Sequence, residues 1–360
     1  MENVTSSPLT SKTLTATEEP LAEDSDAITF PLQVFSMIIY SSAFLVGTVG
    51  NGLVIWVAGF RMTRTVTTIL FLNLAVADFI FCLFLPISVT QVALDFHWPF
   101  GWLGCKFFTT LAVFNLFASV FLLTLISIDR CVSILRPIWA RNHRTPRRAA
   151  LGAGGIWLLA LVLCIPTLLY RDTEMYENGY VSCFLNFDPW NETAEDPELF
   201  TVTEAQRYKA QVAIRFVFGF AIPLVVICSC YGLIAARLQD RQAMRSRRPF
   251  RVLAAVVAAF FFCWLPFHIV SFMELVVILN QLEDLGTWVI LLGSLSTSLA
   301  YVNSCLNPIL YVFMGRDFRE RLLRSLPASL ERALAEESAD SDFKGSNFVS
   351  TPQDTESQEV

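Results

Sequence analysis

The chain has 360 residues, of which 54% are hydrophobic and only 16% are charged, and its formal net charge is −6. A soluble domain carries about 25% charged residues, so this composition excludes an ordinary soluble protein. The apolar residues gather in runs of roughly 20–28 residues, long enough to cross the hydrocarbon core of a bilayer. Because lipid cannot hydrogen-bond the backbone, each run is predicted to be a helix.

Seven apolar runs follow one another along the chain, and none alternates as a transmembrane β-strand would. The predicted fold class is an all-α membrane protein, a seven-transmembrane helix bundle that forms one domain over residues 30–314. We expect residues 1–29, which are polar, to be a disordered extracellular tail without a cleavable signal peptide. The predicted spans are residues 32–59, 66–94, 102–135, 149–170, 209–236, 251–279 and 287–313.

Basic and acidic residues separate onto opposite sides of this bundle. The loops after the first, third and fifth spans are rich in arginine, whereas the N-terminal tail and the long second outer loop, residues 171–208, are acidic. The positive-inside rule then predicts a multi-pass plasma-membrane protein with an extracellular N-terminus and a cytoplasmic C-terminus. Asn3 and Asn191 open glycosylation tripeptides on the predicted outer side.

Two of the nine cysteines fall where an oxidising environment is expected. Cys105 lies at the outer end of the third span and Cys183 lies in the second outer loop, whereas the other seven lie within spans. Because disulfides form outside the cytosol, we predict a bond between Cys105 and Cys183. A thiol inside a span is an ordinary small apolar residue.

Asp78 places a carboxylate in the middle of the second span. Unpaired, it costs roughly 2.5–3.5 kcal/mol on insertion scales, so it needs partners. The candidates on other spans are Asn51, Asn115, Ser119, Asn303 and Asn307. We expect this pocket, apart from Asn51, to bind a sodium ion, and we expect no other cofactor. The alternative is a protonated Asp78 that is hydrogen-bonded to the amides without a metal.

Asp129 and Arg130 end the third span at the predicted cytoplasmic rim. Neighbouring opposite charges lower each other's desolvation cost, and we expect Arg130 to leave Asp129 for another partner when the helices move. The alternative is an arginine whose side chain extends to the lipid headgroups. The three last spans each carry a proline, which kinks a helix, next to residues suited to a switch. These residues are Pro223 and Tyr231, Trp264 and Pro266, and Asn307, Pro308 and Tyr311.

Residues 315–327 follow the seventh span and are rich in arginine. Phe318, Leu322 and Leu323 share one helical face, which predicts an amphipathic helix on the membrane surface; the alternative is a disordered basic segment. Residues 328–360 are predicted to be a disordered, acidic cytoplasmic tail rich in Ser and Thr. The candidate phosphorylation sites in this tail are Ser338, Ser341, Ser350 and Thr351.

These signatures together resemble the rhodopsin-like G-protein-coupled receptors, with one signature in each span. The stretches from Asn51 to Thr68, His97 to Trp102 and Ser325 to Leu334 are similar to the formyl peptide receptors of the chemoattractant branch, and Ser182 to Phe184 is similar to the chemerin receptor. The resemblance implies a receptor for an extracellular peptide or lipid, coupled to Gi-type G proteins and active in chemotaxis and inflammation. It also implies arrestin and receptor kinases as partners and no nucleic acid.

The ligand site departs from the formyl-peptide pattern. By this resemblance, the family binds the formyl-methionine end with an aspartate on the third span and two arginines on the fifth, where this chain has Val113, Gln211 and Arg215. The loss of a buried acceptor is costly for recognition, so binding of formylated peptides is not expected. Arg215 suits a ligand carboxylate, or else it extends to the headgroups or pairs with an outer-loop acid. We place Trp264 and His268 in the same ligand site.

Other functions fit the sequence less well. A transporter or channel is expected to show internal repeats, and none is visible. A retinal protein needs a lysine in the seventh span, which has none, and no constellation for enzymatic chemistry is apparent among the three histidines. The remaining alternative is a receptor of the same fold for chemerin-like peptides or acidic lipid mediators, with weak or arrestin-biased signalling.

Overall fold

The computed structural model describes residues 22–190, 197–239, 248–280 and 282–314. It has seven helical segments that are long and apolar enough to cross a membrane, which confirms the predicted fold class. Their bounds lie within a few residues of the predicted ones for most spans. The segments are Thr29–Arg61, Val66–Ala93, Gly101–Leu135, Pro146–Tyr170, Val202–Arg237, Val257–Asn280 and Trp288–Ile309.

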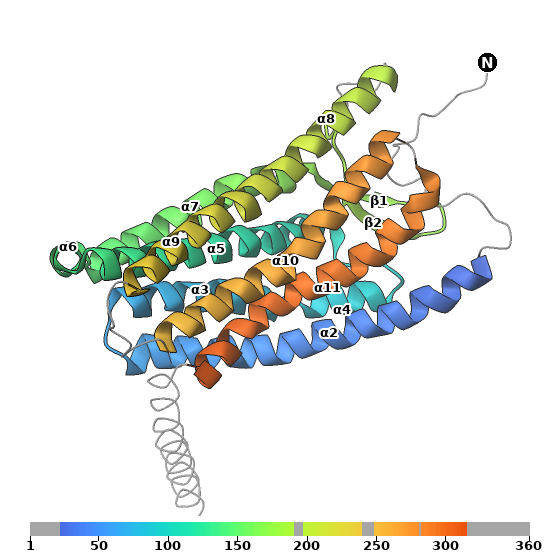
Figure 1. Cartoon of the computed structure of the whole chain (residues 1–360). Coiled ribbons are helices and arrows are strands. Elements are labelled where there is room, and N and C mark those ends of the chain that lie inside the picture. Colours follow the sequence, from blue (N-terminus) through green and yellow to red (C-terminus); the bar gives the residue numbers. More distant parts are fainter. Residues whose placement is uncertain (1–21, 191–196, 240–247, 281, 315–360) are drawn as a thin grey trace, which may run out of the picture.

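The helices run side by side along the long axis of the molecule (Figure 1). A β-hairpin lies at one end, which we call the hairpin end, and the short helix α6 lies at the other, which we call the α6 end (Figure 1). The elements are α2 (Ala22–Trp56), η1 (Val57–Arg61), α3 (Val66–Leu83), α4 (Pro86–Ala93), α5 (Gly101–Leu135), α6 (Pro137–His143), α7 (Pro146–Tyr170), β1 (Arg171–Met175), β2 (Val181–Leu185), α8 (Pro197–Phe216), η2 (Val217–Ala221), α9 (Ile222–Gln239), α10 (Arg248–Asn280) and α11 (Glu283–Met314).

Local sequence explains where several helices begin. The side chain of Thr65 accepts a hydrogen bond from the backbone N–H of Thr68 and so caps α3. Thr145 caps α7 in the same way, and the following Pro146 occupies a first-turn position whose missing N–H costs nothing. In the fifth span the chain widens into a π-helical turn, η2, just before Pro223. Such turns interrupt the regular hydrogen-bond ladder and are frequent at functional sites.

The core of the bundle is built around α5. Val120, Leu123 and Ile126 of α5 pack in one buried cluster with Phe260 and Trp264 of α10. A polar contact also ties two helices together, because Trp157 Nε1 on α7 donates to the amide oxygen of Asn73 on α3 at 3.0 Å. A buried indole N–H usually needs such a partner. Helix α5 therefore packs directly against α10 in the core of the bundle.

Two segments differ from the predicted boundaries. Helix α2 begins at Ala22, although residues up to 29 were expected to be disordered, and α8 begins at Pro197, well before the predicted start at residue 209. Residues 197–208 of α8, which precede the predicted span, are largely polar, so their hydropathy did not predict a membrane-spanning helix. It is held by a cluster in which Tyr208 packs with Phe187 and Leu275.

Some predicted features lie outside the described residues. They are the surface helix at 315–327, the tail at 328–360, and the modification sites Asn3, Asn191, Ser338, Ser341, Ser350 and Thr351. The backbone of Tyr311 belongs to α11, but its side chain also lies outside the described part of the chain.

Candidate functional site

A cavity of about 440 Å³ lies between the helices toward the hairpin end. This volume falls in the usual range for small-molecule and cofactor pockets. Three of the predicted ligand residues line it: Val113 on α5, Arg215 on α8 and Trp264 on α10. Arg171, the first residue of β1, also lines it and was not predicted. Helices α2 and α11 complete the wall with residues such as Tyr40 and Tyr301.

The two other predicted ligand residues, Gln211 and His268, are buried but do not line this cavity. Gln211 Nε2 donates to Thr167 Oγ1 on α7 at 3.3 Å. The His268 ring lies among aromatic side chains, with its centroid 5.8 Å from that of Phe216 and 5.1 Å from that of Phe220. These positions make both residues a support for the cavity wall rather than part of its surface.

Three residues that line this cavity carry a buried polar atom without a hydrogen-bond partner among the described residues. The atoms are Arg171 Nε, Arg215 Nε and Trp264 Nε1. Folded proteins pair nearly all such atoms, so a ligand in the cavity is well placed to supply the missing partners.

Trp264 connects the cavity to the core. It lines the cavity, yet it is only 5% exposed and belongs to the same buried cluster as Phe260. Its ring lies 6.1 Å from Phe260 and 5.6 Å from Phe267, measured between centroids. Pro266 follows within α10, where it removes a backbone hydrogen bond. A ligand that displaces Trp264 must therefore repack α10 at a point where that helix is weakened.

Asp78 sits in a polar network further along the bundle. Its Oδ1 accepts hydrogen bonds from Asn115 Nδ2 at 3.0 Å and Ser119 Oγ at 3.1 Å, and its Oδ2 accepts one from Asn307 Nδ2 at 2.7 Å. Ser304, which was not predicted, donates to Asn115 Oδ1 at 3.0 Å. The network thus joins α3, α5 and α11 through one buried carboxylate.

Two predicted members of this pocket are placed differently. Asn51 Nδ2 donates to the backbone oxygen of Ser304 at 2.8 Å, so it reaches the network through the backbone of α11. Asn303 is buried, but its Nδ2 has no partner among the described residues. Pro308, the residue after Asn307, lies within α11 and lets the helix bend next to the network.

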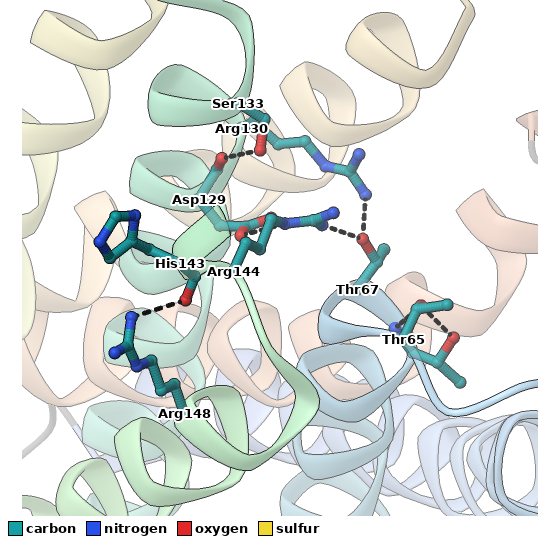
Figure 2. A network of polar contacts seen from close by, with 9 residues as sticks. Thr65, Thr67, Asp129, Arg130, Ser133, His143, Arg144 and Arg148 are labelled. Carbon is teal, nitrogen blue, oxygen red and sulfur yellow. Dashed lines mark hydrogen bonds and ion pairs between the residues drawn. The ribbon is translucent and has the colours of Figure 1, made fainter. Parts of the chain in front are cut away.

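At the α6 end, Asp129 pairs with Arg144 instead of the neighbouring Arg130 (Figure 2). Arg144 Nε donates to Asp129 Oδ1 at 2.6 Å and Arg144 Nη2 donates to Oδ2 at 2.8 Å, a bidentate pair. Arg130 Nη2 instead donates to the hydroxyl of Thr67 at 2.7 Å, and Arg144 Nη2 donates to the same hydroxyl at 2.8 Å. We call Thr67, Asp129, Arg130 and Arg144 the α6-end network.

This arrangement was not predicted, because Arg144 is one of many arginines in a basic loop and Thr67 carries no distinguishing signal. Tyr231, the predicted switch residue of the fifth span, packs against the main core cluster next to α5. The network holds α3, α5 and the loop after α6 in one position, and Arg130 cannot move without leaving Thr67.

The structure joins Cys105 and Cys183 in a disulfide, with their Cα atoms 5.7 Å apart. The bond fixes β2 to the second turn of α5. Because β1 pairs with β2 in antiparallel register, with Thr173 opposite Cys183, the bond also positions β1. Arg171 therefore enters the cavity from a strand that is tied to the bundle.

Comparison with known proteins agrees with this geometry. Residues 50–311 match the family model described as 7 transmembrane receptor (rhodopsin family). The chain is 47% identical over 329 residues to N-formyl peptide receptor 2 of Macaca mulatta and of Homo sapiens, with 91% of this chain and 93% of each relative covered. It is 45% identical over 331 residues to the fMet-Leu-Phe receptor of Oryctolagus cuniculus, with the same coverage. These matches set aside the transporter and enzyme interpretations, and this chain belongs to the rhodopsin family of seven-transmembrane receptors.

Proposed function

We propose that this multi-pass plasma-membrane receptor binds an extracellular peptide in the cavity and activates a Gi-type G protein, as a receptor for chemotaxis and inflammation. One observation carries the proposal: a single helix, α5, contributes to all three functional regions. Val113 lines the cavity, Asn115 and Ser119 bind Asp78, and Asp129 and Arg130 belong to the α6-end network. The relatives named as formyl peptide receptors support a peptide ligand.

In this proposal the hairpin end faces outside and the α6 end faces the cytoplasm. The arginine-rich loops support this orientation, because positive charge favours the cytoplasmic side. The disulfide at the hairpin end also supports it, since disulfides persist outside the cell. The glycosylation acceptors then lie outside, and the C-terminal tail is available to receptor kinases and arrestin.

The proposed mechanism begins at Trp264. An agonist in the cavity loosens the packing between Trp264 and Phe260, and α10 bends at Pro266 and moves outward. A cleft then opens at the α6 end, and Arg130 leaves Thr67 to contact the G protein. Tyr231 and, on α11, Tyr311 swing toward the space that Arg130 vacates. The Asp78 network lies between Trp264 and Arg130 along the bundle. It repacks when the helices move, because it joins α3, α5 and α11.

The coupling is tested in cells that express the receptor at the surface. We expect an agonist to lower cyclic AMP and to dissociate Gi subunits, and we expect pertussis toxin to abolish both responses. A panel of formylated and non-formylated peptides supplies the agonists, with arrestin recruitment measured in parallel. Agonist responses that are wholly resistant to the toxin would refute coupling to Gi, and responses confined to formylated peptides would refute the role given to Val113 and Gln211.

We also propose that sodium stabilises the resting receptor at Asp78. The buried carboxylate has hydrogen bonds but no Lys or Arg partner among the described residues, and Ser119 Oγ offers a neutral oxygen beside it. Asn115 and Asn307 turn N–H groups toward the carboxylate, which also satisfies its charge in part. A small monovalent cation would complete the neutralisation.

The measurement is the unfolding temperature of the purified receptor in sodium chloride and in choline chloride at equal ionic strength. We expect sodium to raise it in the wild type and to have no specific effect in Asp78→Asn. Asp188→Asn, which changes a buried carboxylate near the hairpin, is the control and should keep the sodium effect. Equal unfolding temperatures of the wild type in the two salts would favour the metal-free, hydrogen-bonded acid.

A further inference from the structure

Two guanidinium groups meet in the cavity from different elements. Arg171 is the first residue of β1, and Arg215 lies near the end of α8. Both line the cavity, and the Nε of each is buried without a partner among the described residues. Unpaired buried charges are costly, so the pair is set up to receive an anion.

The two charges act on each other. Burial, and after it the nearby positive charge of Arg215, lower the pKa of the Arg171 guanidinium to about 10. At neutral pH Arg171 is nevertheless protonated, so both side chains remain cationic. Arg215 is also held over the ring of Phe267, with its Cζ 5.6 Å from the ring centroid. This contact orients the guanidinium but supplies no hydrogen-bond acceptor.

One carboxylate acts on the pair from outside the cavity. Glu274 on α10 interacts electrostatically with both Arg171 and Arg215, but it is exposed and does not line the cavity. It offsets part of the positive charge of the pair. A monovalent anion can match the charge that remains.

The surroundings of the two arginines indicate which class of anionic ligand fits the cavity. The cavity wall includes the apolar side chains of Val113, Leu116 and Phe267, and Phe267 lies against Arg215. A guanidinium binds a carboxylate through two parallel hydrogen bonds, and it binds it more strongly where water is excluded. We propose that Arg171 and Arg215 form a shared carboxylate site, and that the receptor's ligand is an apolar molecule that enters with its carboxylate first.

This inference rests on the proposed ligand cavity and deepens it. The carboxylate could be a peptide C-terminus or the head of an organic acid, which present the same chemistry to two arginines. A peptide ligand would enter by its C-terminal end. A formyl group at its N-terminus would then not contact these two arginines. Val113 fits this orientation because it offers no acceptor for a formyl N–H.

The test is a binding measurement on the purified full-length receptor in detergent, without a G protein. The peptide probes are formyl-Met-Leu-Phe with a free C-terminal carboxylate and the same peptide with a C-terminal amide. The non-peptide probes are 4-phenylbutyrate and 4-phenylbutyramide. We expect at least one acid to bind roughly tenfold or more tightly than its amide, since hydrogen bonds to charged groups contribute that much. If the peptide acid binds more tightly than its amide, the carboxylate is a peptide C-terminus. If only 4-phenylbutyrate binds more tightly than its amide, the carboxylate belongs to an organic acid.

The preference should fall to near unity in Arg171→Gln and in Arg215→Gln. Arg207→Gln is the matched control, because Arg207 lies on the same helix α8 but donates to the backbone oxygen of Phe187 and does not line the cavity. Arg171→Lys keeps the positive charge but loses the planar guanidinium, so it should keep part of the preference for the acid over the amide. This variant replaces Arg171→Gln if the glutamine variant does not fold.

Three results overturn the carboxylate site: equal binding of every acid and its amide, no binding of any acid, or a preference that survives Arg171→Gln. These results are separate from those that overturn the proposed function. A receptor that prefers acids but never activates a G protein retains the site and loses the function. A receptor that signals through Gi without any preference for an acid retains the function and loses the site.

Discussion

Replacing either Cys105 or Cys183 with alanine is expected to abolish agonist binding at the cell surface. The disulfide closes a loop with a sequence separation of 78 residues. Removing it restores about 4.5 kcal/mol of chain entropy to the unfolded state in the loop-closure model. The larger effect is local, because the bond holds the hairpin that delivers Arg171 to the cavity. Agonist binding and the unfolding temperature of the purified protein both measure this effect.

Other contacts also hold the hairpin. The backbone N–H of Trp98 donates to the carbonyl of Val181 at 2.9 Å, and the N–H of Val181 donates to His97 Nδ1 at 3.0 Å. Val181 and Cys183 also pack against Trp98 and Phe108, and the disulfide adds a covalent link to these contacts. Cys228→Ala is the control, because Cys228 is a free, exposed cysteine on α9. Normal agonist affinity in both single disulfide variants would show that the hairpin is held without the bond.

The membrane architecture could be predicted from the sequence because its cause is local. A run of apolar residues that is long enough to cross the bilayer must form a helix whatever it packs against. The boundary at residue 209 was wrong for α8 because the helix continues outward through polar residues to Pro197. That extension is stabilised by the contact of Tyr208 with Phe187, which no hydropathy pattern reports.

The functional residues were predicted less completely, because their partners are distant in sequence. Asp78 was certain to need partners, and Asn115 and Ser119 were the natural candidates on α5, since residues at spacing i, i+4 share one helix face. The rotation of α11 determines which of its two asparagines faces Asp78, and the sequence does not specify that rotation. In the structure Asn307 donates to Asp78, whereas Asn303 does not. Arg171 was missed because a loop arginine carries no sign of entering a cavity.

The contacts of the α6-end network could not be predicted from the sequence either, because they also join residues that are distant in sequence. Adjacent Asp129 and Arg130 suggested a pair within one helix, but consecutive residues on a helix do not face each other. Asp129 instead meets Arg144, which comes from the loop that follows α6, and Arg130 points to Thr67 at the start of α3 (Figure 2). The partner of Asp129 is therefore set by where α6 folds back, which the basic loop composition does not encode.

Breaking the pair between Asp129 and Arg144 is expected to raise agonist-independent G-protein activation. In Arg144→Ala the Thr67 hydroxyl loses one of its two donors and Asp129 loses both of its hydrogen bonds from Arg144. The loop after α6 is then released from α5, and Arg130 has more freedom to turn into a cytoplasmic cleft. Loss of about 1–2 kcal/mol from the resting state corresponds to a roughly five- to thirtyfold shift in a two-state equilibrium. Basal nucleotide exchange on Gi, in membranes with equal receptor amounts, measures this shift.

The chain offers a closely matched control in Arg148→Ala. Arg148 lies four residues from Arg144 and carries the same charge, but its side chain donates to the backbone oxygen of His143 at 2.9 Å and does not reach Asp129 (Figure 2). If general loss of positive charge in this loop raised basal activity, both variants would do so equally. If the network restrains the resting state, only Arg144→Ala and Asp129→Asn should do so, and combining them should add little because both remove the same contact. Basal exchange that is unchanged in both single variants would mean that the pair holds the loop without restraining Arg130.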